Sequence, residues 1–196
     1  VINSITFDSN SALERGGAIY NNLSSPSLAN LTISGNIAPL GAGIYNSEHS
    51  NPTLTSVLFF GNQASQEGAA IYNSYSPPTL INSILWDSGP DEISGNTVTN
   101  ASYSIIQGGY LGEGNLSDDP LLGPLQDNGG PTLTHALLPG SAAIDAGSPT
   151  ICPFFDQRGY NRPLDGNGDG VPVCDIGPFE FSLSNTILIY LSLIFK

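Results

Sequence analysis

Apolar and polar residues alternate in short segments that recur at a nearly constant distance along the chain. Apolar residues stand two positions apart in residues 5–7, 31–33 and 57–59, as Ile5 and Phe7, Leu31 and Ile33, and Val57 and Phe59. Successive segments are 26 residues apart, and a fainter fourth copy covers residues 83–86. A period of two is typical of a strand that buries one face.

Two further blocks recur in the same order. The first contains an Ile-Tyr-Asn triplet at 19–21, 44–46 and 71–73, and the second a Pro-x-Leu triplet at 26–28, 52–54 and 78–80. Self-similarity at a fixed period indicates a solenoid in which each coil is one repeat. Gly, Pro, Asn and Ser bound the segments, and no long amphipathic helical pattern occurs before residue 130.

These patterns predict an all-β fold, a right-handed parallel β-helix with about 26 residues per coil and an irregular C-terminal cap. We expect β-helix repeats over residues 1–117, the cap over 118–182 and an apolar tail over 183–196. The tail is too short to span a bilayer, which needs about 20 apolar residues. It is either an edge strand or packed segment, or the start of a sorting or anchoring segment.

Stacked coils place equivalent side chains in columns. We expect an inward column of Ile19, Ile44 and Ile71, an outward column of Tyr20, Tyr45 and Tyr72, and a turn column of Asn10, Asn36 and Asn62. Asn tolerates turn geometry, and stacked amides bond along the axis, so the Asn column is interpreted as structural. The Tyr column is either plain surface packing or a stripe that binds a sugar or a protein.

The charge balance restricts the partners. The chain has 196 residues, with 4 Lys+Arg against 17 Asp+Glu, a net charge of −13. The four cations are scattered, which argues against binding to nucleic acid or to an anionic membrane surface. The chain begins at Val1 rather than at Met, and we expect a processed chain or a fragment.

Two resemblances to known families imply a location outside the cell. Residues 16–19 (Gly-Gly-Ala-Ile) and the Phe-x-x-Asn units at 7–10 and 59–62 resemble repeats of polymorphic outer-membrane autotransporters, whose β-helical passenger domains act as adhesins. Residues 127–147 and 152–180 are similar to the choice-of-anchor Q domain of large bacterial surface proteins, which follows β-helix repeats and precedes cell-surface anchors. The resemblance implies an extracellular or cell-surface location, although the tail contains no complete anchor.

An acidic loop is a candidate calcium site. Asp165, Asn167 and Asp169 alternate with glycines, Val171 could offer its carbonyl, and Asp175 follows. Oxygen ligands at this spacing suit a hard cation such as Ca²⁺. The position that carries a bidentate acid in an EF-hand is Ile176, so a simple Asp/Gly turn cluster is the alternative.

The two cysteines, Cys152 and Cys174, are expected to form a disulfide in an exported protein. Arg158 and Arg162 stand among Asp145, Asp156, Asp175 and Glu180. We interpret these charges as ion pairs within the cap, against the alternative that an Arg holds an acidic sugar.

A polysaccharide-acting lyase or glycoside hydrolase is the alternative function, because such enzymes also use this fold. A lyase needs a positioned basic residue, and residues 1–117 contain only Arg15; a hydrolase needs paired carboxylates, and Asp118-Asp119 precedes a proline. We therefore predict no catalysis. The predicted function is a structural, fibre-forming or adhesive surface module. The partners would be a glycan, a host or neighbour-cell surface protein, or a second copy stacked end to end.

Overall fold

The computed structural model describes residues 1–89 and 91–183, so the predicted tail lies outside the described residues except for Leu183. Every element in this part of the chain is a β-strand. The strands of the helix are β1 (Ile2–Asp8), β2 (Ile19–Asn22), β3 (Ser27–Ser34), β4 (Ile37–Leu40), β5 (Ile44–Ser47), β6 (Thr53–Phe60), β7 (Gln63–Glu67), β8 (Ile71–Asn73), β9 (Thr79–Ile81), β10 (Ile84–Trp86), β11 (Ile93–Gly95), β12 (Asn100–Ser102) and β13 (Ile105–Ile106). A C-terminal hairpin follows, formed by β14 (Leu122–Gln126) and β15 (Thr134–Leu137).

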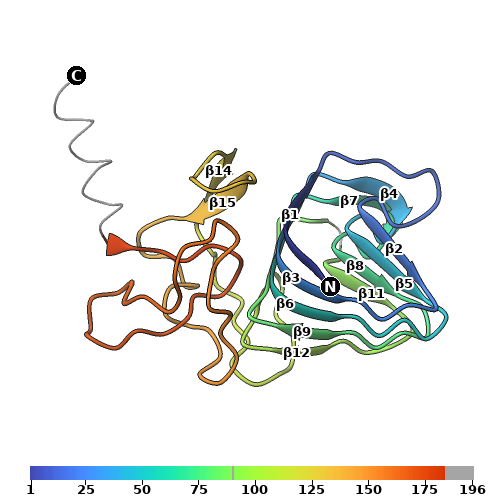
Figure 1. Ribbon diagram of the computed structural model, residues 1–196. Helices are drawn as coiled ribbons and strands as arrows, with labels where there is room; N and C mark the ends of the chain where they lie inside the picture. Colours follow the sequence, from blue (N-terminus) through green and yellow to red (C-terminus); the bar gives the residue numbers. More distant parts are fainter. Residues whose placement is uncertain (90, 184–196) are drawn as a thin grey trace.

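The first thirteen strands form a parallel β-helix of about four turns (Figure 1). We call the successive turns coil 1 to coil 5, beginning at β1, β3, β6, β9 and β12; coil 5 is partial. The first sheet has the order β1-β3-β6-β10-β13, with β9 and β12 paired alongside it. The second sheet pairs β4 with β7, and the third has the order β11-β8-β5-β2. All pairs within these three sheets are parallel, which confirms the predicted fold class.

The register between coils follows the sequence repeat. Ile19 pairs with Ile44, and Ile44 pairs with Ile71, although their spacings differ by two residues. Ile44 and Ile71 are fully buried, and they belong to a core that the first sheet completes with residues such as Leu31 and Phe59. The predicted inward column is therefore confirmed. Its apolar area, removed from water, is the main favourable contribution to stacking.

A kink at one position of every coil shapes the first sheet. Residues Ser4, Asn30, Ser56, Asn82 and Tyr103 have left-handed backbone angles, with φ between 47° and 55°. The kink interrupts the alternation of strand residues, so that Leu28 and Leu31 both lie in the buried core. One wide sheet thereby turns a corner without losing its coil-to-coil pairing.

The irregular C-terminal segment, residues 118–183, lies along the side of the helix rather than over one of its ends (Figure 1). Leu58, Ile84 and Ile105 are fully or almost fully buried and form a second core with residues of this segment. That core is completed by Leu137, Ala143, Ile176, Phe179 and Phe181. The segment lies there because coils 3 to 5 carry apolar residues on the outer face of the first sheet, and the segment covers them.

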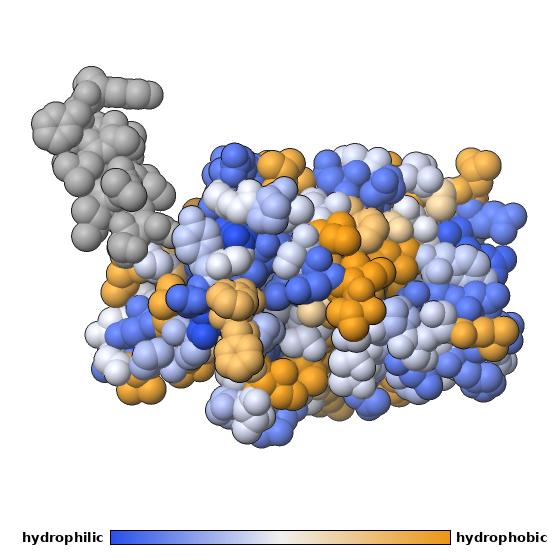
Figure 2. Space-filling view, in the orientation of Figure 1, coloured by the Kyte–Doolittle hydropathy of each residue, from blue (hydrophilic) through white to orange (hydrophobic). Residues whose placement is uncertain are grey.

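Coils 1 and 2 meet the same segment through polar groups. In coil 1, Thr6 Oγ1 donates to the Leu133 carbonyl at 2.6 Å. Thr32 donates to Gln157 Oε1 at 2.7 Å, and Ser34 Oγ lies 3.1 Å from His135 Nε2. The outer surface in this view mixes hydrophilic and hydrophobic residues rather than forming one apolar field (Figure 2). The side of the helix therefore changes from polar to apolar along the axis, and the C-terminal segment matches both parts.

Candidate functional site

The tyrosine column lies on the third sheet in the predicted register, with Tyr20 paired to Tyr45 and Tyr45 to Tyr72. The rings of Tyr45 and Tyr72 are stacked, with centroids 5.1 Å apart and an interplanar angle of 6°. Tyr20 meets Tyr45 edge to face at 5.5 Å. Tyr20 is 48% exposed, whereas Tyr45 is only 6% exposed.

This geometry leaves little ring face for a ligand. Sugar recognition by an aromatic platform needs a free ring face, and the facing surfaces of Tyr45 and Tyr72 are occupied by each other. The guanidinium of Arg15 lies 5.3 Å from the ring centroid of Tyr45 and 6.0 Å from that of Tyr20, a cation–π arrangement. The contacts favour the packing interpretation, and a ligand stripe at these tyrosines stays a prediction.

The asparagine column forms a ladder of hydrogen bonds along the helix axis. Asn36 Oδ1 accepts from both the backbone N–H and the side-chain Nδ2 of Asn10, at 3.0 and 2.9 Å. Asn62 Oδ1 accepts the same two bonds from Asn36, at 3.0 and 2.9 Å. Asn36 and Asn62 are fully buried, so these bonds satisfy groups that water cannot reach. The structural interpretation of the column is consistent with these contacts.

The acidic loop at residues 165–171 is a set of tight turns. Asp165 accepts from the N–H groups of Gly168 and Gly170, at 2.7 and 2.9 Å. Asn167 Oδ1 accepts from Asp169 N–H, and Asp169 Oδ1 accepts from Val171 N–H, both at 2.8 Å. Short polar side chains that bond the backbone two residues on are typical of turns. The bonds fit the interpretation as an Asp/Gly turn cluster, and calcium binding by this loop stays a prediction.

Asp175, the remaining predicted ligand, is directed elsewhere. It is fully buried, and its two carboxylate oxygens accept from the N–H groups of Asp145 and Phe181, at 2.8 and 2.5 Å. In residues 1–89 and 91–183, no group of three or more His, Cys, Asp or Glu side chains is arranged to hold a metal ion. Asp175 is close to the acidic loop in sequence, but its side chain belongs to the interior of the C-terminal segment. Calcium binding stays a prediction.

A buried ionic network joins the C-terminal segment internally and to the helix. Arg162 Nε donates to Glu180 Oε2 at 2.7 Å, and both side chains are completely buried. Arg162 also donates to the Asp175 carbonyl at 2.6 Å and to Ser56 Oγ of β6 at 3.3 Å. Arg162 therefore contacts one strand of the helix and two separate parts of the C-terminal segment.

The pKa values of the two acids near Arg162, Asp175 and Glu180, are both raised. Burial and, secondarily, the neighbouring Glu180 raise the pKa of Asp175 to about 8. Burial also raises the pKa of Glu180, although Arg162 opposes the shift. The N–H bonds that Asp175 accepts from Phe181 and Asp145, and the more distant Arg162, oppose this rise but do not cancel it.

Arg158 forms a second buried pair beside the first. Its Nη2 lies 2.6 Å from Asp156 Oδ2, and both side chains are at most 3% exposed. The guanidinium also stacks on Phe179 and Tyr160, at 3.5 and 4.5 Å from the ring centroids. The structural interpretation of both arginines as ion-pair partners is consistent with these contacts.

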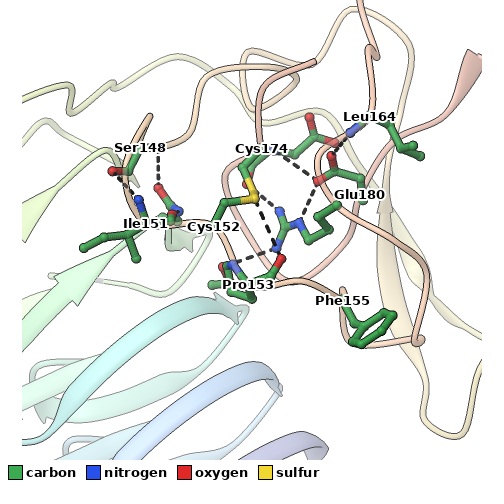
Figure 3. The surroundings of a disulfide bond; sticks show 12 residues. Ser148, Ile151, Cys152, Pro153, Phe155, Leu164, Cys174 and Glu180 are labelled. Carbon is green, nitrogen blue, oxygen red and sulfur yellow. Dashed lines mark hydrogen bonds and ion pairs between the residues drawn. A yellow bond between two sulfur atoms is a disulfide. The ribbon is translucent and has the colours of Figure 1, made fainter.

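The predicted disulfide is confirmed. Cys152 and Cys174 are bonded, with Cα atoms 5.9 Å apart, and no free cysteine remains. Figure 3 shows the bond among the loops that also carry Glu180 and its contact to Leu164. The Cys174 carbonyl accepts from Gly147 N–H at 2.7 Å. The crosslink therefore braces the same irregular segment as the ionic network.

His135 is a buried residue to which sequence reasoning assigned no role. Its Nδ1 lies 2.7 Å from the carbonyl of Gly123 and its Nε2 lies 3.1 Å from Ser34 Oγ, so both ring nitrogens are occupied. Burial lowers its pKa, although the Gly123 contact opposes the shift. The one sequence signal for this role is that His135 stands within residues 134–137, where polar and apolar residues alternate as in a strand. Its contacts make it part of the junction between segment and helix.

Two segments of the chain match the Chlamydia polymorphic membrane protein repeat, residues 4–22 and 56–74. Their starts are 56 − 4 = 52 residues apart, two periods of the helix, and they cover equivalent parts of coils 1 and 3. No curated protein and no solved structure matches the chain. The similarity to a choice-of-anchor Q domain stays a prediction. Within the described residues, no helix has the length and apolar character needed to cross a membrane.

Proposed function

We propose that this chain is a non-catalytic extracellular β-helix module that serves a structural or adhesive role at a cell surface. The observation that carries the proposal is the match of coils 1 and 3 to the Chlamydia polymorphic membrane protein repeat, together with the parallel stacking of those coils. A stacked helix exposes an extended surface rather than a single cleft. A disulfide also suits an oxidising compartment outside the cytosol.

Location is tested on intact cells that produce the chain. We expect antibodies against the β-helix to label unpermeabilised cells, and external protease to remove the label. A signal that requires permeabilisation would overturn the surface assignment. A second test incubates the purified chain with a panel of polysaccharides, with and without Ca²⁺; release of reducing ends or unsaturated products would overturn the non-catalytic assignment.

Adhesion is tested separately from location. A glycan array and a binding assay on cell monolayers would be probed with the purified chain and with a Tyr20→Ala/Tyr72→Ala variant. Tyr45 is left in place because it is buried between its neighbours. Binding that the variant loses supports an adhesive tyrosine surface. No binding by either protein supports a structural stalk, and light scattering over a concentration series then tests end-to-end stacking of copies.

A further inference from the structure

The asparagine ladder ends at a residue that breaks the repeat. The backbone N–H of Asn62 donates to Ser88 Oγ at 3.3 Å, which continues the ladder into coil 4. The backbone N–H of Ser88 then donates to Glu92 Oε1 at 3.0 Å, within the same coil. Each earlier N–H of the ladder donates to a side chain of the next coil, whereas Ser88 N–H donates to a side chain four residues further along the same coil.

Glu92 occupies a place that earlier coils reserve for small residues. Ile93 pairs with Ile71, so Glu92 is in register with Ala70, and in the same way with Gly43. A Cβ at Gly43 would lie 2.4 Å from the Ala70 carbonyl oxygen and 2.8 Å from the Phe59 ring, which shows how little space this column has. In coil 5 the residue in register with Ser88 is Gly109, which has no side chain, and the neighbouring Gln107 accepts from Asp87 N–H instead.

We propose that Glu92 is a protonation-controlled cap of the β-helix: its neutral carboxyl closes the ladder by holding Ser88, and loss of the proton releases Ser88.

In its closed position the carboxyl group is bonded only to Ser88, which is too little to stabilise a buried charge. Glu92 is 7% exposed, and its Oε2 is buried with no hydrogen-bond partner. A buried, unpaired carboxylate is strongly unfavourable, whereas the neutral acid loses only one hydrogen bond. Burial, which outweighs the bond from Ser88, raises the pKa of Glu92 to about 8, and Asp87 adds to the shift.

The surrounding charges have the same sign. Asp87 and Asp91 line the same hollow as Glu92, Glu67 ends the neighbouring strand β7, and coil 5 contributes Tyr110. Within the described part of these elements there is no Lys, Arg or His to pair with the carboxylate. Ionisation of Glu92 therefore adds repulsion to the cost of burial.

The ionised side chain has a place to go. A hollow of about 500 Å³ lies beside Glu92 and is lined by Asp87, Asp91, Gln107, Gly109 and Tyr110. It is large enough to hold many water molecules. Rotation of Glu92 into this hollow hydrates the carboxylate, but it breaks the bond to Ser88 and leaves the last rung of the ladder unsatisfied.

Amide hydrogen exchange at Ser88 reads the cap directly. After correction for the intrinsic rate, we expect protection of Ser88 N–H to fall at least tenfold between pH 7 and pH 9, while Asn36 N–H stays protected. Glu92→Gln keeps an acceptor but cannot ionise, so its Ser88 protection should not change with pH. The matched control Glu113→Gln should respond as the native chain does. A pH-independent native protein, or a Glu92→Gln variant that still responds, would overturn the proposal.

A second measurement needs no variant and covers the case in which Glu92→Gln does not fold. The ¹³C shift of the Glu92 carboxyl in the native chain reports its titration. A midpoint near 8 supports the cap, and a midpoint near the ordinary glutamate value of about 4.3 would overturn it.

Discussion

Removal of the Arg162 charge should weaken the junction between the helix and the C-terminal segment more than any surface change. Arg162→Met keeps most of the apolar stem but removes the bond to Glu180, the bond to the Asp175 carbonyl and the contact to Ser56. Because both side chains of the pair are completely buried, Glu180 is left as an uncompensated charge. Removal of one partner of a buried pair typically costs about 3–5 kcal/mol, and we expect a loss of this size in the free energy of unfolding.

The assay is urea unfolding followed by fluorescence of Trp86, the only tryptophan. Trp86 packs against the second core, between the first sheet and the C-terminal segment, so its emission reports this junction. Arg15→Met is the matched control, since Arg15 pairs with Glu14 at 3.6 Å on an exposed surface and should cost about 1 kcal/mol or less. The double variant Arg162→Met/Glu180→Gln should recover at least about 1 kcal/mol, because it removes the stranded charge.

Two results would refute this reasoning. One is a loss for Arg162→Met no larger than that for Arg15→Met. The other is a double variant that shows no recovery, because the cost would then come from packing rather than from the uncompensated carboxylate. The loss should also be smaller at pH 5 than at pH 8, since the stranded acid can be neutral at the lower pH.

Three further outcomes are expected. Gly43→Ala should destabilise the chain by about 1–3 kcal/mol in urea unfolding, because its Cβ would overlap the next coil. Gly89→Ala is the control and should change stability little, because a Cβ there meets nothing within 4 Å. Equal effects of the two variants would contradict the register. Replacement of both Cys152 and Cys174 by Ala should cost about 3 kcal/mol for a separation of 22 residues, and an unchanged melting temperature would contradict this. Stability should fall from pH 6.5 to 8.5, by at most about 1.4 kcal/mol per pH unit for Glu92. Its folded-state pKa of about 8 lies above the unfolded value near 4.5, so the folded state alone holds the proton at the lower end of this range and loses it as the pH passes 8. Asp175, whose pKa is also raised to about 8, contributes to the same slope, so Glu92→Gln should reduce the slope rather than abolish it; a slope that persists unchanged would contradict the assignment.

The helix was predictable because its information is local and repeated. The same short block places an isoleucine at 19, 44 and 71, which predicts the inward column. The structure pairs these residues in that order. The register survives unequal spacings because only one alignment buries all three side chains. The disulfide was predictable for a different reason, since a chain with two cysteines allows only one intramolecular pairing.

The placement of the C-terminal segment was not predictable from the repeat. Thr32 and Leu58 are paired residues of adjacent strands on the outer face, yet one bonds Gln157 and the other enters the second core. A change from polar to apolar residues at this position was visible in the sequence, but it does not say which of the later residues cover it. The contact between Thr32 and Gln157 spans 125 residues, and no local pattern encodes it.

The acidic residues show the same limit at the candidate sites. Asp175 follows the loop at 165–171 closely in sequence, but its side chain bonds Asp145 and Phe181 instead. The residues around Glu92 in the sequence are typical of an exposed turn, yet its side chain accepts from Ser88 N–H. The direction of a side chain at an irregular position depends on which backbone N–H groups lack a partner, and this is known only once the coils are stacked.

The central claim is that equivalent side chains of successive coils lie directly over one another, and methyl NMR tests it most directly. With ¹³C-labelled isoleucine methyl groups assigned by single Ile→Val variants, we predict nuclear Overhauser effects between Ile19 and Ile44 and between Ile44 and Ile71, since adjacent strands lie about 4.8 Å apart. Absence of both effects in a folded sample would contradict the β-helix.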